Sequence, residues 1–424
     1  MRVVIWHGYL LHGTGSNEYT RALARTLARQ GHDVTVLSQD PDPASLDLGG
    51  ATAIRPSLPS RLPVFVLDRY PDAEAALLPE MPRDEVDAFV GAQAATIRDL
   101  GPADLLIVNH VLLGAPVGAA SGLPFVVKAH GSELEYAMRT SAPLRAWAAE
   151  TLPAARAVAV GSAHVGRVVA ELTGIPVDAT TIVPPGVDVE FMAPQESRAE
   201  ALAGLLAACA DDGPDRGERL PDPGNEARLR GFLADPRPPT VLYVGKLSRE
   251  KGVHLLVEAM AGLTARLVVV GFGPARPDLE RQATHLGVDA VFTGPLQHRH
   301  LRHLWALSDV SVVPSVFPEA FGMVAAEAAA TGCPPLVADH SGLAEVADGI
   351  EAHLPTELHL LRFRRDDCED LRRALLRLLA LPAPERARLA AGCRAAVEAQ
   401  WSWPEVARRM LALGAAHATS ASAG

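Results

Sequence analysis

An α/β fold of two doubly wound, Rossmann-like domains facing each other across a cleft is the architecture that this sequence predicts. The chain has 424 residues. That is too many for one typical hydrophobic core and suits two domains of roughly 200 residues each. In both halves, short valine-rich runs alternate with helix-forming stretches, the pattern of a parallel sheet covered by helices. Hydrophobic residues make up 48% of the chain, so each half can build its own core.

The first domain is expected to span residues 1–194. It opens with a strand at Arg2 to Trp6, a loop, and a helix from about Glu18 to Gln30 that Gly31 ends. This strand, loop, helix and strand order is typical of a doubly wound sheet. The later strands of this domain are predicted at Val34 to Ser38, Leu105 to Val108, Phe125 to Lys128, Ala157 to Val160 and Thr181 to Pro184.

Residues 195–238 interrupt this alternation, and we expect them to connect the two domains and to carry an insertion. Helix-like sequence rich in Ala and Glu passes there into DDGPDRGERLPDPGNE. The density of Pro, Gly and acidic residues in that run predicts a partly mobile loop.

Strands and helices alternate again over 239–400, the expected second domain. Its strands are predicted at Thr240 to Val244, Leu267 to Val270, Val291 to Thr293, Val310 to Val313 and Leu336 to Ala338. Its helices are predicted at His254 to Met260, Asp278 to Leu286, Val324 to Ala330, Asp370 to Ala380 and Pro384 to Gln400. A final helix is expected at 401–416, and the tail at 417–424 should be disordered.

Composition excludes several classes of function. The formal net charge is −11 and no tract of Lys and Arg stands out, so a nucleic-acid partner is not expected. The four cysteines form no CxxC pair or metal-binding spacing, which favours a reducing compartment. The N-terminus lacks a signal-peptide core, and no run reaches the roughly 20 apolar residues of a membrane span. We therefore expect a cytoplasmic protein, with peripheral membrane contact left open.

The stretch from Pro314 to Glu327, PSVFPEAFGMVAAE, joins a predicted strand to a predicted helix and is the strongest candidate for a site. Unpaired N–H groups at the positive end of a helix attract anions such as phosphate, and Gly322 would let the backbone approach a ligand. Glu319 should stand at the mouth of the loop and Glu327 inside the helix. From these residues alone, an ordinary loop with a solvated Glu and a helical Glu stays equally open.

Other loops at predicted strand ends also carry residues that could bind a ligand, because ligands of open α/β sheets bind outside the carboxyl ends of the strands. These loops are Gly13 to Asn17, His130 to Glu133, Gly245 to Gly252, Gly271 to Pro274 and Ser341 to Glu345. The first is not a G-x-G-x-x-G motif, so NAD binding is disfavoured. Lys246 and Lys251 could both neutralise a diphosphate. Ordinary turns, a structural histidine and solvated lysines remain the alternatives.

Taken in chain order, these stretches resemble the motifs of retaining glycosyltransferases of family 4, also called glycosyltransferase group 1, which include glycogen synthases and phosphatidylinositol mannosyltransferases. The E-x7-E signature of that family, with its inner Phe-Gly, is matched by Glu319, Phe321, Gly322 and Glu327. The resemblance runs from Gly13 to about Trp403. It implies the two-domain fold called GT-B, with the last helix crossing back onto the first domain.

The sequence departs from the family pattern at a few positions. Thr14 replaces one glycine of the Gly-Gly loop, which leaves Gly15 as the phosphate-contacting candidate. Lys246 stands where an arginine is more common, which keeps the charge but loses the planar fork. His110, at another strand end of the first domain, is a weaker candidate for lining the cleft.

The resemblance implies a role for each matched residue. The catalytic residues would be His130, Lys246, Lys251 and Glu319. The donor-binding residues would be Gly15, Gly273, Phe321, Gly322, Met323, Glu327, Leu343 and Glu345. The two lysines and the N–H groups around Phe321 to Met323 would stabilise the leaving diphosphate. Glu319 would hydrogen-bond the hydroxyls of the donor sugar, and Glu327 those of the ribose.

The function that follows is transfer of a hexosyl group, with retention, from a nucleotide-diphosphate sugar to a small-molecule, lipid or glycan acceptor. A UDP- or GDP-sugar is the expected donor, held by the second domain, while the first holds the acceptor. No DxD-like pair stands at a strand end, so we expect no metal and no cofactor. The alternatives are a nucleotide-sugar epimerase or a sugar phosphorylase on the same fold, or a non-catalytic protein that binds sugar nucleotides.

Overall fold

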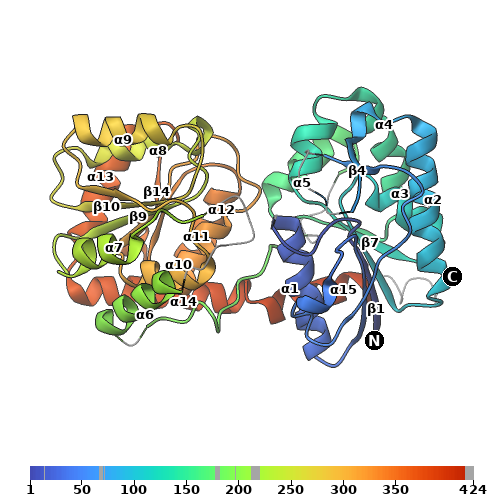
Figure 1. Ribbon diagram of the computed structural model, residues 1–424, viewed down its shortest axis with the longest axis horizontal. Coiled ribbons are helices and arrows are strands. Elements are labelled where there is room, and N and C mark those ends of the chain that lie inside the picture. Colours follow the sequence, from blue (N-terminus) through green and yellow to red (C-terminus); the bar gives the residue numbers. More distant parts are fainter. Residues whose placement is uncertain are drawn as a thin grey trace. The chain divides into compact units, whose positions relative to one another are not determined.

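The chain divides into two compact units (Figure 1). The computed structural model describes residues 1–13, 15–65, 70, 72–176, 182–195, 197–211 and 220–415. Unit 1 consists of Met1–Gly186 together with the chain from Trp403 onward, and unit 2 consists of Val187–Ser402. Each unit is a parallel sheet covered by helices, so the predicted α/β fold of two doubly wound units is confirmed.

The sheet of unit 1 has the strand order β3-β2-β1-β6-β7-β8, with every neighbouring pair parallel. Its strands are β1 (Arg2–Trp6), β2 (Asp33–Leu37), β3 (Thr52–Ile54), β6 (Leu105–Asn109), β7 (Phe125–Lys128) and β8 (Ala157–Ala159). A separate parallel pair is formed by β4 (Leu62–Val64) and β5 (Ala75–Leu77), which the sequence did not predict.

Helices cover both faces of this sheet, which explains why its central strands β1, β6 and β7 are buried along almost their whole length. They are α1 (Gly15–Arg29), α2 (Arg83–Asp99), α3 (Gly114–Ser121), α4 (Ala142–Thr151), α5 (Ala163–Thr173) and α15 (Trp403–Ala415), and a π-helix spans Glu133–Met138. Along β1, Val3 and Ile5 pack with α1 and α15, whereas Val4 and Trp6 pack on the opposite face with α2 to α5. Successive side chains of a strand point to opposite faces, so one strand contributes to both cores.

The sheet of unit 2 has the order β11-β10-β9-β12-β13-β14, again with every neighbouring pair parallel. Its strands are β9 (Thr240–Val244), β10 (Arg266–Val270), β11 (Ala290–Phe292), β12 (Val310–Val313), β13 (Pro335–Ala338) and β14 (Arg362–Phe363). Its helices are α6 (Arg198–Ala210), α7 (Asn225–Leu233), α8 (Val253–Met260), α9 (Arg276–His285), α10 (His298–Ala306), α11 (Met323–Ala330), α12 (Ser341–Glu351), α13 (Cys368–Leu379) and α14 (Ala383–Gln400).

Short 3-10 turns complete both units. They lie at Pro43–Ser45, Leu78–Glu80, Leu152–Ala154, Arg249–Lys251 and Thr356–Leu358. No helix of the described ranges is long and apolar enough to cross a membrane.

The boundaries of the units differ from those expected from the sequence. The change of unit falls at Gly186 rather than at 194, because Val187 and Met192 are buried in the core of unit 2. The described part of 195–238 is not a simple connection: Leu205 of α6 and Leu229 of α7 are fully buried in that same core.

Three stretches of the sequence predictions lie outside the described residues. They are Thr181, residues 212–219 of the acidic run, and the tail at 417–424. Of the strand expected at Thr181 to Pro184, the described part forms one bridge, between Ile182 and Val160. The last helix begins at Trp403, two residues later than predicted, because Trp401 is buried in unit 2.

Candidate functional site

The strand order of unit 2 reverses between β9 and β12, and this is where ligands of doubly wound sheets bind. Two loops follow these strands at their carboxyl ends, 245–252 after β9 and 314–322 after β12. The backbone joins them, since the N–H groups of Val316 and Phe317 donate to the carbonyl oxygen of Glu250 at 2.9 and 3.1 Å. The two loops therefore form one rigid edge, and both lysine candidates and Glu319 lie on it.

Lys251 and Glu319 form an ion pair on this edge. The Nζ atom of Lys251 lies 2.5 Å from Oε1 of Glu319, and both side chains remain partly exposed, at 33% and 23%. The two side chains are 68 positions apart in the sequence, and the loop contacts bring them together. A cation beside a carboxylate at a switch point can receive both a phosphate and a sugar hydroxyl.

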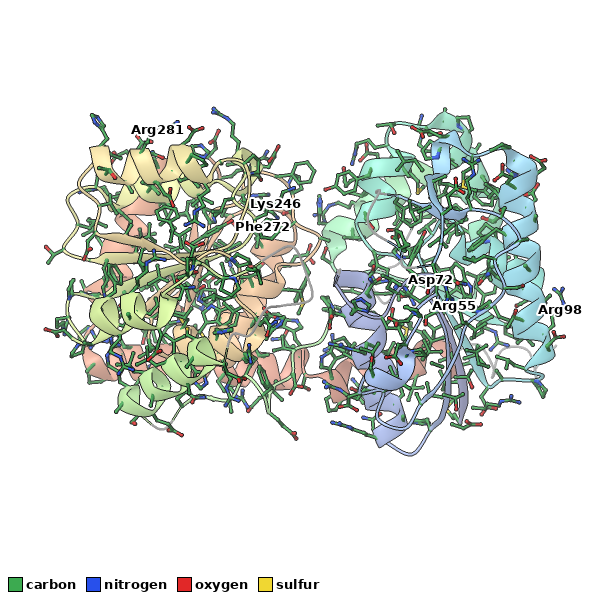
Figure 2. The ribbon with its side chains drawn as sticks, in the orientation of Figure 1. Arg55, Asp72, Arg98, Lys246, Phe272 and Arg281 are labelled. Atoms are coloured by element: carbon green, nitrogen blue, oxygen red, sulfur yellow. The ribbon has the colours of Figure 1, made fainter. Side chains whose placement is uncertain are left out.

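Lys246 stands on the same loop but makes no ion pair among the described residues. Its side chain is exposed, and its carbonyl oxygen accepts a hydrogen bond from the Tyr243 hydroxyl at 2.8 Å. Phe272, in the loop after β10, lies beside this loop, as Figure 2 shows, because its carbonyl oxygen accepts from the N–H of Leu247 at 2.8 Å. The predicted Gly273 belongs to this second loop.

The helix α11 begins where the sequence places an anion-binding end. Gly322 is its N-cap with a φ of +118°, a conformation that favours glycine, and a Cβ atom there would meet Leu343 at 2.7 Å. Met323 is the first helical residue, so its N–H is one of the unpaired donors of the first turn. Phe321 is buried with its ring 5.4 Å from that of Trp401, and it anchors the loop to the core of unit 2.

The loop after β13 fixes Glu319 in place, and the sequence analysis had not assigned it this role. The N–H of Glu319 donates to Oγ of Ser341 at 3.0 Å, and its carbonyl oxygen accepts from the N–H of Gly342 at 3.0 Å. The ring of His340 reaches the carbonyl oxygen of Ser315, with 2.7 Å between Nε2 and that oxygen. The Ser-Gly pair between a strand and a helix is the sequence signal that could have revealed these contacts with Glu319.

Leu343 and Glu345 were predicted to bind the donor. The side chain of Leu343 is fully buried and supports the backbone of Gly322, so only its main chain could face a ligand. Glu345 lies in the first turns of α12 and is half-buried. Both residues remain predicted donor contacts.

Glu327 lies one turn into α11 and meets a partner that the sequence did not reveal. The Nε2 atom of His298, the first residue of α10, lies 3.1 Å from Oε1 of Glu327. The His298 side chain is 60% exposed and that of Glu327 is 14% exposed. Like the Lys251–Glu319 pair, this is a contact between a basic and an acidic side chain on unit 2.

In unit 1, His130 follows β7 and is held by its neighbours. Its Nε2 atom lies 2.8 Å from Oδ1 of Asn109, and its backbone N–H donates to Oε1 of Glu133 at 2.8 Å. Burial, followed by the nearby His110 and Lys128, holds the pKa of His130 well below its usual value. The ring is therefore neutral at pH 7, which suits a hydrogen-bonding role better than an ionic one.

Gly15 is the first residue of α1, and the space where a Cβ atom would stand is open. An N–H group at the start of a helix with no side chain beside it can be approached closely. Thr14, which precedes it, lies outside the described residues.

Family sequence models match both units. The model described as "Glycosyltransferase Family 4" matches residues 13–191, and the model described as "Glycosyl transferases group 1" matches residues 226–392. The chain belongs to glycosyltransferase family 4. The family named by the resemblance in the sequence is thus confirmed.

Named relatives of this family 4 protein are similar over part of its length. The chain is 38% identical to the sulfoquinovosyl transferase SQD2 of Arabidopsis thaliana over 28% of its own length and 23% of that protein. It is 40% identical to a GDP-mannose-dependent phosphatidylinositol dimannoside mannosyltransferase of Mycobacterium tuberculosis over 28% of the chain and 32% of that protein. With a D-inositol 3-phosphate glycosyltransferase of Xylanimonas cellulosilytica it shares 35% identity over 57% and 52%. These matches span about half or less of each relative.

Solved structures establish the GT-B fold of this family 4 protein. The sucrose-phosphate synthase of Thermosynechococcus elongatus superposes with a TM-score of 0.67 at 22% identity, covering 100% of both chains. The HepE protein of Anabaena, in complex with UDP-glucose, gives a TM-score of 0.67 at 15% identity, covering 97% of this chain and 99% of that one.

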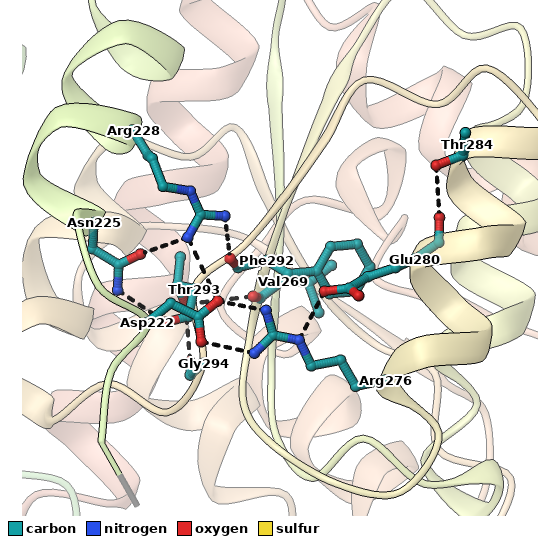
Figure 3. Close-up of polar contacts among 10 residues, drawn as sticks. All are labelled: Asp222, Asn225, Arg228, Val269, Arg276, Glu280, Thr284, Phe292, Thr293 and Gly294. Atoms are coloured by element: carbon teal, nitrogen blue, oxygen red, sulfur yellow. Dashed lines mark hydrogen bonds and ion pairs between the residues drawn. The ribbon is translucent and has the colours of Figure 1, made fainter.

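A cluster of ionic contacts fixes the end of the acidic run onto unit 2 (Figure 3). Arg276 pairs through both terminal nitrogens with the carboxylate of Asp222, and Arg228 donates to the carbonyl oxygen of Phe292 at 2.6 Å. The N–H of Asp222 and the amide of Asn225 both donate to the carbonyl oxygen of Thr293 at 2.9 Å. The hydrogen bonds from Arg276 lower the pKa of Asp222 although burial opposes this. The cluster anchors 220–228 at the end of β11.

Within the described ranges, no three His, Cys, Asp or Glu side chains gather as metal ligands would. The sequence analysis had also missed the Asp222 cluster, because Asp222 and its main partner Arg276 lie 54 positions apart.

Proposed function

We propose that this family 4 glycosyltransferase moves a hexosyl group from a UDP- or GDP-sugar to a hydroxyl group of an acceptor, with retention at the anomeric carbon. The observation that carries the proposal is the Lys251–Glu319 pair, which the loops after β9, β12 and β13 hold at the switch point of unit 2. A cation and the unpaired N–H groups of α11 can neutralise a leaving diphosphate. A carboxylate can accept hydrogen bonds from sugar hydroxyls.

The donor class is supported by the names of similar proteins. One relative is described as GDP-mannose-dependent, and HepE was solved with UDP-glucose bound. The acceptors in the relatives' names are a phosphatidylinositol dimannoside and D-inositol 3-phosphate. For this chain we accordingly propose a sugar, lipid or small-molecule acceptor that carries a free hydroxyl group.

In the proposed reaction, unit 2 holds the donor and unit 1 the acceptor. The acceptor oxygen forms a bond to the anomeric carbon on the face from which the diphosphate departs. The bond between that carbon and the phosphate oxygen breaks, its electron pair leaves with the diphosphate, and the leaving phosphate takes the hydroxyl proton. Lys246 and Lys251 stabilise the departing charge, Glu319 and His130 contact the sugar, and Glu327 receives the ribose hydroxyls. No metal or cofactor takes part.

A donor screen tests the proposal. The purified protein is heated with UDP-glucose, GDP-mannose, ADP-glucose or dTDP-glucose, with and without EDTA, and its melting temperature is recorded. Stabilisation by one donor that EDTA leaves unchanged is the expected result, because a ligand that binds only the folded state raises the melting temperature. Loss of the shift in EDTA would contradict the metal-free scheme, and no shift with any donor would contradict the function itself.

Product analysis separates transfer from the alternatives on the same fold. With the stabilising donor and D-inositol 3-phosphate, D-glucose or glycerol as acceptor, a transferase makes a new glycoside and releases the nucleoside diphosphate. An epimerase would change the donor sugar without any acceptor, and a non-catalytic binding protein would leave the donor intact.

A further inference from the structure

A histidine and a glutamate from two different helices of unit 2 form a hydrogen-bonded pair, His298 of α10 with Glu327 of α11. The Nε2 atom of His298 lies 3.1 Å from Oε1 of Glu327, although the two residues are 29 positions apart in the sequence. A carboxylate has no hydrogen to give, so this nitrogen carries the hydrogen and donates it. His298, to which the sequence assigned no role, therefore holds one oxygen of a predicted donor contact.

Glu327 is the one ionisable residue of α11, whose sequence is MVAAEAAA. The five alanines of this helix are buried, whereas Met323, Val324 and Glu327 are partly exposed. Residues four positions apart share a face of a helix, so Glu327 lies on the accessible face that begins at Met323. The two residues are about 6 Å apart along the helix axis. That spacing suits a nucleotide whose diphosphate meets the helix N-terminus and whose ribose lies beside the first turn.

The start of α10 holds the backbone of His298 in a fixed place. Gln297 is the N-cap of this helix, and its N–H donates to Nδ1 of His300 at 3.2 Å. The His300 side chain is fully buried, and so is Trp305, whose Nε1–H donates to Oγ of Ser311 at 3.2 Å. The backbone that carries His298 is thus anchored in unit 2, although the side chain itself is 60% exposed.

The pair is poorly explained by the stability of the fold. Ion pairs and hydrogen bonds with one well-exposed partner contribute little to stability, and the His298 side chain is such a partner. Among the described residues, His298 is the only hydrogen-bond partner of the Glu327 carboxylate. A carboxylate has about four acceptor positions, so several are left to receive hydroxyl groups of a ligand.

We propose that His298 is the positioning residue that fixes the Glu327 carboxylate for the ribose of the donor. Its Nε2–H binds Oε1 and holds the carboxylate in one orientation, so that the remaining acceptor positions meet the two neighbouring hydroxyl groups of a ribose. The nucleotide is then held by α10 and α11 together, and a donor that lacks either hydroxyl group, such as a dTDP-sugar, is disfavoured. This inference rests on the proposed function and names the residue that sets its preference for ribonucleotides.

Titration calorimetry of the full-length protein tests the proposal without relying on activity. The probes are UDP, GDP and their 2′,3′-dideoxy forms, which lack both hydroxyl groups. His298→Ala removes the donor to Glu327, and His298→Gln keeps an N–H group at a similar reach. His285→Ala, at an exposed position of α9, is the matched control.

We expect wild-type protein to bind one ribonucleotide at least about tenfold more tightly than its dideoxy form, because hydrogen bonds to a charged group are lost in the latter. His298→Ala should weaken binding of the ribonucleotide about tenfold and leave binding of the dideoxy form unchanged. His298→Gln should keep most of the preference, and His285→Ala all of it.

An unchanged preference in His298→Ala, or an equal loss of affinity for both forms, would overturn the inference, because the first shows no effect on the ribose and the second a general structural defect. Equal binding of both forms by wild-type protein would overturn it as well. If wild-type protein binds neither UDP nor GDP, the proposed function itself fails. Normal binding with a preference that is independent of His298 is a failure of this inference alone.

A double-mutant cycle tests whether His298 acts through Glu327. In a Glu327→Ala background, His298→Ala should cause no further loss of ribonucleotide affinity, since the group that it positions is absent. Additive losses would contradict the positioning role.

Kinetics with the donor sugar that wild-type protein uses give a further readout. His298→Ala should raise the KM for the donor about tenfold and leave kcat and the KM for the acceptor unchanged, because a ribose contact is equally strong before and during the reaction. A fall in kcat with the donor KM unchanged, or equal rises in both KM values, would contradict a specific role in holding the ribose.

Discussion

The ion pair of Lys251 and Glu319 is the residue-scale feature on which the proposed chemistry depends. Both side chains are partly exposed, and partly exposed ion pairs contribute little to the stability of a fold. A substitution at Lys251 therefore tests function with little effect on folding. The chain has three lysines, Lys128, Lys246 and Lys251, and Lys128 is buried in unit 1 with its Nζ 2.7 Å from the carbonyl oxygen of Val183.

Replacing Lys251 by methionine should reduce kcat about 100- to 1,000-fold, because one charge that stabilises the departing diphosphate is lost. The melting temperature of the free protein should stay close to that of wild type. Steady-state kinetics with the donor found in the screen provide the measurement. Arg281→Met, which removes an exposed cation on α9, is the matched control and should leave kcat unchanged. Normal turnover in the Lys251 variant would contradict the assigned role.

At the scale of elements, the loop after β13 acts as a brace for the loop after β12. Gly342 is essential to it, because a Cβ atom at that position would stand 2.5 Å from Cα of Phe321. Through Ser341 and Gly342, the start of α12 sets the position of Glu319 and of the N-terminus of α11. The brace explains how a short loop can hold Glu319 in one position.

Gly342→Ala should therefore push the backbone of Phe321 aside and lower both activity and donor binding. The expected result is loss of the donor-induced shift in melting temperature together with a fall of at least about tenfold in kcat/KM, since displacement of a positioned group by a fraction of an ångström is costly. Gly231→Ala is the control, because the Cβ position of that helical glycine is open. If Gly342→Ala binds and turns over the donor like wild type, the brace has no functional role.

The Asp222 cluster makes a prediction about pH. The pKa of the Asp222 carboxyl group is lowered in the folded state, first by the hydrogen bonds from Arg276. The carboxylate therefore stabilises the fold above its unfolded pKa of about 3.9. This stabilisation is lost as the pH falls through the folded-state pKa. Urea unfolding of wild type and Asp222→Asn should differ near pH 7 and converge below about pH 3.9. A gap in stability that stays undiminished well below that pH, where the folded carboxylate is also protonated, would show that the carboxylate charge is not what anchors 220–228.

Part of this architecture could be predicted because its signals are local. Four strands have the predicted bounds, because short valine-rich runs that are buried on both faces favour a strand of a parallel sheet. They are Arg2–Trp6, Phe125–Lys128, Thr240–Val244 and Val310–Val313. In contrast, β3 and β5 are three-residue strands of ordinary composition. Such short strands form through their neighbours, so the sequence did not reveal them.

The candidate site could also be predicted only where its signals are local. Motif positions indicated which loops matter, but pairs such as Lys251 with Glu319 or His298 with Glu327 depend on how distant loops fold together. The role of Ser341 and the buried Glu133 likewise arise from tertiary packing, because each acts on a backbone group in its folded loop. The roles themselves remain predictions for kinetics to test.

At the scale of the whole molecule, each unit has its own hydrophobic core and the chain passes from unit 2 back to unit 1 through Trp401, Ser402 and Trp403. Trp401 is buried in the core of unit 2, against Phe321. Trp403 is buried in unit 1, with its ring 5.5 Å from that of Tyr19. Two tryptophans two positions apart thus anchor the same segment in two different cores.

The two tryptophans should accordingly have separable effects. Trp403→Ala should destabilise unit 1 and Trp401→Ala unit 2, each by about 3–5 kcal/mol, the usual cost of truncating a buried aromatic side chain. Hydrogen exchange measured by mass spectrometry would locate the loss of protection, in α1 and α15 for the first variant and in α11 and α14 for the second. Equal loss in both units from either change would mean that they unfold as one.

The most direct test of the central claim is the stereochemistry of the product. Proton NMR of a reaction started with UDP-glucose or GDP-mannose, whichever donor binds, and a polyol acceptor reports the anomeric configuration of the first product formed. The account predicts a glycoside with the same configuration as the donor, in EDTA, and its loss in Lys251→Met. A product of inverted configuration, or a donor that stays intact with every acceptor, would contradict it.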